Sequence, residues 1–144
     1  MSAVIASPVR RADDVPLARL YVLRAVYLFI VVGLAFNVWP DVIDPGRHWG
    51  HLEGQTECML AAFSLLCALS LRYPLQMLPI LLWETLWKTM WLAIVPLPQW
   101  LAGHLDASLQ PAIFANSLVL LVYIGVPWRY VFVHYVKARG DRWR

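Results

Sequence analysis

The chain has 144 residues, of which 60% are hydrophobic and 15% are charged, and its formal net charge is +3. A soluble domain of this size needs more polar surface, so the composition excludes an ordinary water-soluble domain and indicates a protein of the lipid bilayer. The two cysteines, Cys58 and Cys67, fall on opposite faces of a helix, which favours two buried apolar side chains over a disulfide.

Residues 1–16 contain prolines and mixed charges and are predicted to form a flexible tail. Four apolar segments follow, each near the length of about 20 residues that a helix needs to cross a bilayer. A helix suits this setting because it satisfies its own backbone hydrogen bonds. The predicted spans are residues 20–39, 56–71, 75–95 and 111–130, the last interrupted by Pro127.

The short turn Arg72-Tyr73-Pro74 joins the second and third spans, which predicts that these two helices form an antiparallel hairpin. The predicted fold class is all-α, an integral membrane four-helix bundle formed by residues 17–136. A basic tail, residues 137–144, follows it.

Lysine and arginine are distributed unequally about the predicted spans. Arg47 alone falls in the loops on the side away from the termini, and Lys88 falls inside the third span. The positive-inside rule therefore predicts that both termini are cytoplasmic. The side predicted to be cytoplasmic holds the other ten: Arg10, Arg11, Arg19, Arg24, Arg72, Arg129, Lys137, Arg139, Arg142 and Arg144.

The third span contains the sequence L-L-W-E-T-L-W-K-T-M-W, which places Glu84 and Lys88 near its middle. A central charged residue costs about 2.5–3.5 kcal/mol on the insertion scale, so this helix is expected to need neighbouring helices. Glu84 precedes Lys88 by four residues, the favourable order for an ion pair within a helix. Three interpretations stay open: a structural pair buried against other helices, a ligand, proton or ion site, and a pair that meets a second protein.

Tryptophans and further polar residues accompany this pair. A stripe beside it is predicted to be a packing face for lipid, a quinone-like ligand or a partner helix, and it consists of Trp83, Trp87 and Trp91. Each of the other three spans offers a polar side chain at a depth comparable to that of Lys88. These side chains either converge on one pocket or make separate contacts between helices. They are Asn37, Glu57 and Asn116.

Motifs with assigned chemistry are absent from the sequence. His48, His51 and Glu53 are plausible metal ligands, but their spacing is a weak pattern, so no metal site is predicted. Without a phosphate-binding loop, a dinucleotide motif or a nucleophile elbow, no catalytic residue or cofactor is identified. The C-terminal stretch P-W-R-Y-V-F-V-H-Y-V-K-A-R-G-D-R-W-R suits anionic lipid headgroups rather than nucleic acid.

The first helix, R-A-V-Y-L-F-I-V-V-G-L-A-F-N-V-W-P, and the short turn between the second and third spans resemble those of uncharacterised four-span proteins of the bacterial inner membrane. The span pattern also has the general shape of the DoxX-like proteins, some of which are linked to quinone-coupled redox chemistry. This resemblance covers the spans only and carries over no residue role. It implies a location in the bacterial inner membrane.

Three classes of function follow. The favoured class is a non-enzymatic accessory or interaction subunit, bound to another membrane protein or to a second copy, and it predicts that Trp87 and Trp91 face outward from the bundle. The second class binds a quinone, a lipid or another small apolar molecule, or assists redox chemistry, in a cavity lined by Glu84, Lys88 and Asn116. A proton or ion carrier is placed last, because four short spans leave little room for alternating access.

Overall fold

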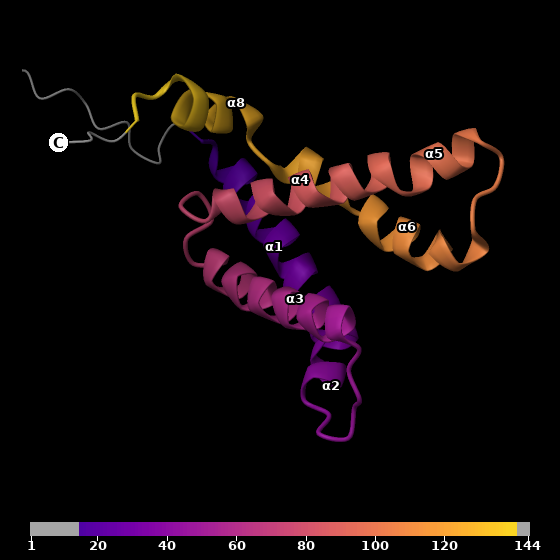
Figure 1. Ribbon diagram of the computed structural model, residues 1–144. Coiled ribbons are helices and arrows are strands. Elements are labelled where there is room, and N and C mark those ends of the chain that lie inside the picture. The colour runs from indigo at the N-terminus through magenta and orange to yellow at the C-terminus, as the bar shows by residue number, and fades with distance from the viewer. Residues whose placement is uncertain (1–14, 141–144) are drawn as a thin grey trace, which may run out of the picture.

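The computed structural model describes residues 15–140, and every regular element in that range is helical, which confirms the predicted all-α class (Figure 1). Of the two predicted tails, residues 1–14 and 141–144 lie outside the described residues. Four helical stretches are long and apolar enough to cross a membrane: Leu17–Asn37, His51–Ser70, Leu78–Leu101 and Ala107–Gly125. In chain order the elements are α1 (Leu17–Asn37), α2 (Trp39–Val42), α3 (His51–Ser70), α4 (Leu78–Ile94), α5 (Pro96–Leu101), the 3-10 helix η2 (Ala107–Leu109), α6 (Gln110–Ser117), α7 (Val119–Gly125), α8 (Trp128–Val131) and the π-helix η3 (Phe132–Lys137).

Prolines set several helix boundaries. The third span extends beyond its predicted end, because α5 starts at Pro96 and the fixed φ of proline suits the first turn of a helix. Val126 has an extended backbone, as residues before a proline usually do, and it ends α7 earlier than predicted. The chain then turns into α8 and η3. The second span also starts earlier than predicted. Its helix, α3, begins at His51 rather than at residue 56, because a helix can include polar residues that a prediction from hydropathy excludes from the span.

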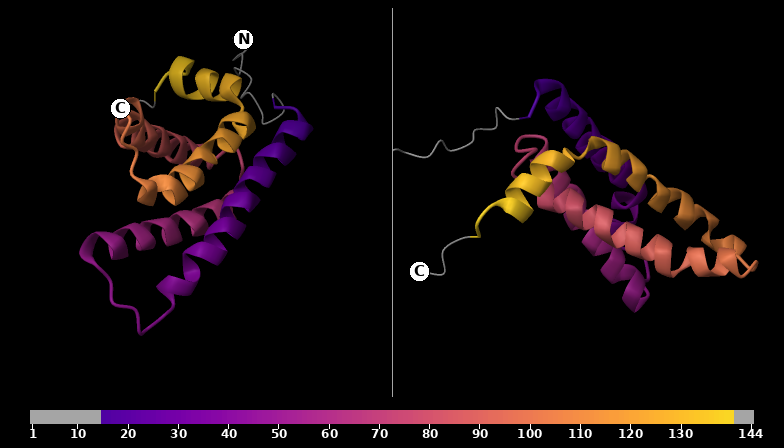
Figure 2. Two further views of the ribbon diagram at one scale, coloured as in Figure 1. Left: turned by 90° about the vertical axis from the view of Figure 1, so that its right-hand side faces the viewer. Right: turned by 90° about the horizontal axis from the view of Figure 1, so that it is seen from above.

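The four spans are arranged as two pairs of helices. In the first pair α1 packs against α3, and in the second pair α4 packs against α6 and α7. The pairs meet through contacts of α1 with α7 and of α3 with α4. Away from this meeting point they diverge, so that α2 and α5 lie far apart (Figures 1 and 2). We call the end where the pairs meet the turn end; it holds the start of α1, residues 71–77 and the end of α7.

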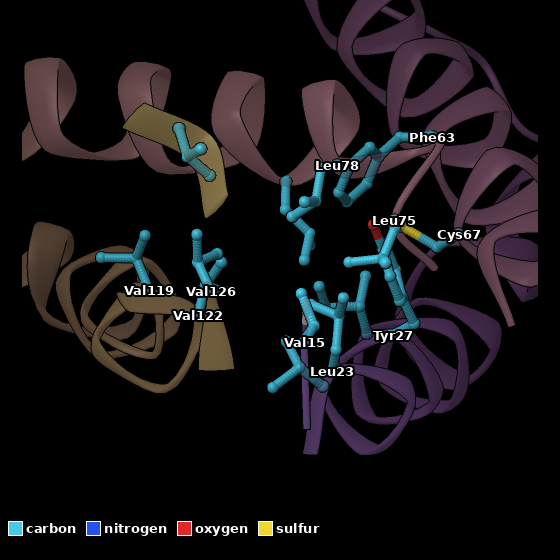
Figure 3. Close-up of a cluster of buried hydrophobic side chains, with 14 residues drawn as sticks. Val15, Leu23, Tyr27, Phe63, Cys67, Leu75, Leu78, Val119, Val122 and Val126 are labelled. Atoms are coloured by element: carbon cyan, nitrogen blue, oxygen red, sulfur yellow. The ribbon is translucent and has the colours of Figure 1, made fainter. Parts of the chain in front are cut away.

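The hydrophobic core lies at the turn end, where all four spans contribute side chains (Figure 3). Two polar side chains of α1 satisfy backbone carbonyls of the turn that joins α3 to α4. Arg24 Nε donates to the Leu71 carbonyl at 3.2 Å, and the buried Tyr27 hydroxyl donates to the Pro74 carbonyl at 3.2 Å. The α1 helix therefore holds this turn by hydrogen bonds as well as by packing. Fully buried side chains at its centre are Leu23, Tyr27, Cys67, Ser70, Leu78, Leu81 and Val126.

Large apolar side chains are exposed along all four spans. Phe36 is 78% exposed, Phe114 is 71% exposed and Ile124 is 68% exposed. A water-soluble monomer rarely leaves continuous apolar surface of this extent uncovered. The exposed apolar surface is what a lipid bilayer would cover.

Ion pairs order the loop between α2 and α3. The Arg47 guanidinium lies 2.5 Å from an oxygen of Asp41 and 2.9 Å from an oxygen of Glu53. The hydrogen bond to Glu53 raises the pKa of Arg47, so this cation stays charged. In the loop of the second pair, Asp106 Oδ1 accepts a hydrogen bond from the Ser108 backbone N–H at 2.9 Å, which lowers the pKa of that carboxyl.

Candidate functional site

Glu84 and Lys88 form a closed ion pair in the middle of α4. The distance between Lys88 Nζ and Glu84 Oε1 is 2.6 Å. The other carboxylate oxygen, Oε2, accepts a hydrogen bond from the Trp87 indole N–H at 2.8 Å. Glu84 is only 2% exposed, so this carboxylate is removed from the surroundings of the protein. Both of its oxygens have a partner, as a buried charge requires.

The pair lies on the face of α4 that is turned toward the other helices. Leu81 and Thr85, which share this side of the helix, are buried. The opposite face carries exposed side chains at the three- and four-residue spacing of a helix. They are Trp83, Leu86, Met90 and Ile94. The charges are thus inside and the outward face is uncharged, which is the arrangement that a membrane favours.

The three tryptophans of the predicted stripe have different surroundings. Trp83 is 40% exposed, and its ring lies 5.6 Å from that of Phe63 on α3 and 6.1 Å from that of Trp87. Trp87 is half-buried, and its ring has Lys88 Nζ at 5.6 Å from the centroid, within range of a cation–π interaction. Trp91 is also half-buried, so neither Trp87 nor Trp91 points fully outward.

Of the three tryptophans in the stripe, two have an indole N–H without an acceptor among the residues that the structure describes. Trp39 donates to the Ser64 hydroxyl and Trp87 donates to Glu84, whereas Trp83 and Trp91 make no hydrogen bond within residues 15–140. An indole N–H usually finds a partner when water is excluded. Any acceptor for Trp83 and Trp91 must therefore come from their surroundings.

The structure does not bring the other predicted polar residues into contact with the pair. Asn37 is exposed, and its amide donates to the Gly33 carbonyl of its own helix at 2.7 Å. Glu57 is half-buried, and its Oε2 is buried without a hydrogen bond among the described residues. Both residues lie on the first helix pair, at the end that points away from α4 (Figure 1). Asn116 is half-buried on α6, which does pack against α4.

The loop between α2 and α3 and the start of α3 hold the three residues considered as metal ligands, His48, His51 and Glu53. His51 and Glu53 lie in the first turn of α3, and Glu53 pairs with Arg47. Within residues 15–140, no three histidine, cysteine, aspartate or glutamate side chains are grouped so that they could hold a metal ion.

A cavity at the turn end was not predicted from the sequence. Its volume is about 820 Å³, and it lies between the start of α1, the end of α7 and the α8–η3 segment. The basic, aromatic C-terminal stretch indicated contact with anionic headgroups, but nothing in the sequence indicated that Arg19 would join it. Three basic and three aromatic residues line the cavity: Arg19, Arg129, His134, Tyr123, Trp128 and Tyr130.

Comparisons with protein-family models, with curated proteins and with solved structures find no match to this chain. They therefore leave the resemblance to DoxX-like proteins as a prediction. The function has to be argued from the geometry of the chain itself.

Trp87→Phe should destabilise the protein, because it removes the indole N–H that donates to Glu84 Oε2, while it keeps an aromatic ring beside Lys88. We expect a loss of about 1.5–3 kcal/mol in the free energy of unfolding, which is typical of a hydrogen bond to a charged group. The measurement is reversible unfolding in detergent micelles, followed by circular dichroism. Trp83→Phe is the matched control, since the described residues offer its indole no acceptor. Equal losses in both variants would show that the hydrogen bond to Glu84 contributes nothing specific.

Proposed function

We propose that this chain is a multi-pass protein of the bacterial inner membrane with both termini in the cytoplasm. Four helices of sufficient length and hydropathy support membrane insertion. The distribution of basic residues supports the orientation, because Arg19 and Arg72 belong to the turn end and Arg129 lines the cavity there. The cavity at the turn end then faces the cytoplasmic leaflet.

We further propose a non-enzymatic role as an accessory subunit of another membrane protein. The observation that carries this proposal is the closed state of the Glu84–Lys88 pair. Lys88 and Trp87 each engage one of the two carboxylate oxygens, so the charge of Glu84 is matched within α4 itself. Such a pair serves to hold α4 among its neighbours rather than to react.

Trp91 supports the choice of a partner protein. It lies within the stretch Leu78–Leu101, about midway along, where lipid chains offer no hydrogen-bond acceptor. Its half-buried indole has no acceptor among the described residues. A helix of a second protein can supply one, such as a serine or threonine hydroxyl or a backbone carbonyl. Trp83, nearer the turn end, can reach the polar headgroup region instead.

The test is native mass spectrometry of the protein extracted in native lipid patches. The wild-type chain should carry a co-purifying protein of fixed mass and stoichiometry. Trp91→Ala should release it. The matched control is Leu86→Ala, which removes an exposed side chain from another part of the outward face of α4 and should retain the partner.

Two results would contradict the accessory role. One is a wild-type chain without any partner protein. The other is a partner that Trp91→Ala retains. A bound small molecule that is lost in the Glu84→Gln, Lys88→Met double variant would instead favour the ligand-binding alternative. Reporter fusions at both termini test the orientation separately, and a periplasmic signal from either would overturn it.

A further inference from the structure

The cavity at the turn end concentrates positive charge. Arg19 comes from α1, Arg129 from α8 and His134 from η3, and all three side chains line the same space. Among the described residues, no aspartate or glutamate lines it. An anion in this cavity would therefore meet two permanent positive charges and an imidazole ring.

Arg19 is positioned by the break at Pro127. The extended backbone at Val126 ends α7 and leaves the last carbonyls of that helix without partners in the helix. Arg19 Nη1 donates to one of them, the Ile124 carbonyl, at 3.1 Å. A guanidinium has five N–H donors, so most of them remain for an anion in the cavity.

Aromatic contacts define the walls of the cavity. The rings of Tyr123 and Trp128 are stacked with centroids 5.6 Å apart, and the Trp128 indole donates to the Tyr123 carbonyl at 2.8 Å. The rings of Tyr130 and His134 are stacked at 3.8 Å, and His134 Nδ1 lies 3.2 Å from the Tyr130 carbonyl. Because a carbonyl only accepts, this contact requires a proton on His134 Nδ1, and Nε2 can donate to an anion only when the ring carries a second proton.

We propose that this cavity binds the phosphate of an anionic phospholipid from the cytoplasmic leaflet. A free phosphate shares the same chemistry, but the apolar border of the cavity favours the lipid. Ile124 lines the cavity and is 68% exposed, and Leu120, on the same side of α7, is 63% exposed. These side chains offer an acyl chain a path that begins at the headgroup. Basic pockets of this kind at the cytoplasmic surface of membrane helices suit anionic headgroups. The proposal rests on the proposed membrane setting but not on the accessory role.

The experiment measures lipid binding to the purified full-length chain by native mass spectrometry in detergent. Dioleoylphosphatidylglycerol is the probe, and dioleoylphosphatidylcholine is the zwitterionic reference with the same acyl chains. Arg19→Gln with Arg129→Gln should weaken phosphatidylglycerol binding about 30-fold, at about 1 kcal/mol for each arginine. Binding of phosphatidylcholine should change little in the same variant.

The matched control is Arg72→Gln with Arg139→Gln, which removes the same charge from residues that do not line the cavity. This control should retain most of the affinity for phosphatidylglycerol. Equal loss in the two double variants would reduce the effect to general surface charge and overturn the proposal. Displacement of the lipid by millimolar inorganic phosphate would also overturn it, in favour of a soluble anion.

A single variant separates a loss of lipid binding from a loss of the fold. Arg129→Gln alone alters an exposed side chain that makes no hydrogen bond within residues 15–140, so the fold should persist. It should weaken phosphatidylglycerol binding about fivefold, the effect of about 1 kcal/mol. Wild-type affinity in this correctly folded variant would overturn the assignment of Arg129 to the site.

Discussion

Glu84→Ala is expected to lower the free energy of unfolding by about 3–5 kcal/mol, the largest effect of any single substitution that we propose. The reason is that it leaves the Lys88 ammonium, whose side chain is only 17% exposed, without its counter-ion. It also removes the acceptor of the Trp87 indole. We expect low yield in the membrane and a large decrease in the unfolding midpoint in micelles.

The double variant Glu84→Gln, Lys88→Met separates the cost of a stranded charge from the value of the pair. It removes both charges at similar volume, and the new amide oxygen can still accept from the Trp87 indole. Replacing a buried ion pair in this way is often neutral or stabilising, so this variant should be close to wild type. If Glu84→Ala were as stable as the double variant, the interpretation of a buried structural pair would be wrong.

Gly125→Ala is expected to loosen the contact between α7 and α1. A Cβ atom at this position would lie 2.5 Å from Val26 Cγ2, which is closer than carbon atoms approach. Val26 is buried, and its branched side chain has few alternative rotamers. One of the two helices must therefore shift, at a cost of about 1–3 kcal/mol. The measurement is the unfolding midpoint in micelles, with phosphatidylglycerol binding as a second readout because the same junction borders the cavity.

Gly33→Ala is the matched control for this change, since it adds the same methyl group to another helical glycine. No atom lies within 4 Å of the position of its Cβ. The substitution should stabilise α1 by about 0.5–1 kcal/mol, because glycine loses more backbone freedom on folding than alanine does. Gly125→Ala with wild-type stability would show that the two helices are not in close contact at this point.

The helical class, the four spans and the internal Glu84–Lys88 geometry could be predicted from the sequence, because each depends on residues close together in the chain. Span length and hydropathy are sums over about 20 residues. A four-residue spacing places two side chains on one face of any α-helix, so the distance of 2.6 Å between Lys88 and Glu84 needs only a local helix. The interruption at Pro127 is local in the same sense.

Only the tertiary structure decided which way these local elements face and which of them meet. The tertiary structure turned the Glu84–Lys88 pair toward the other helices and placed Asn37 and Glu57 away from it. It also brought Arg19 to the Ile124 carbonyl, 105 residues away in the sequence. In a bilayer, apolar side chains gain little by leaving lipid for protein, so hydropathy does not select the neighbours of a helix. That choice depends on shape, as where Gly125 admits Val26, and on isolated hydrogen bonds between distant segments. Neither a close fit of shape nor an isolated hydrogen bond produces a periodic pattern of residues, so neither could be predicted from the sequence alone.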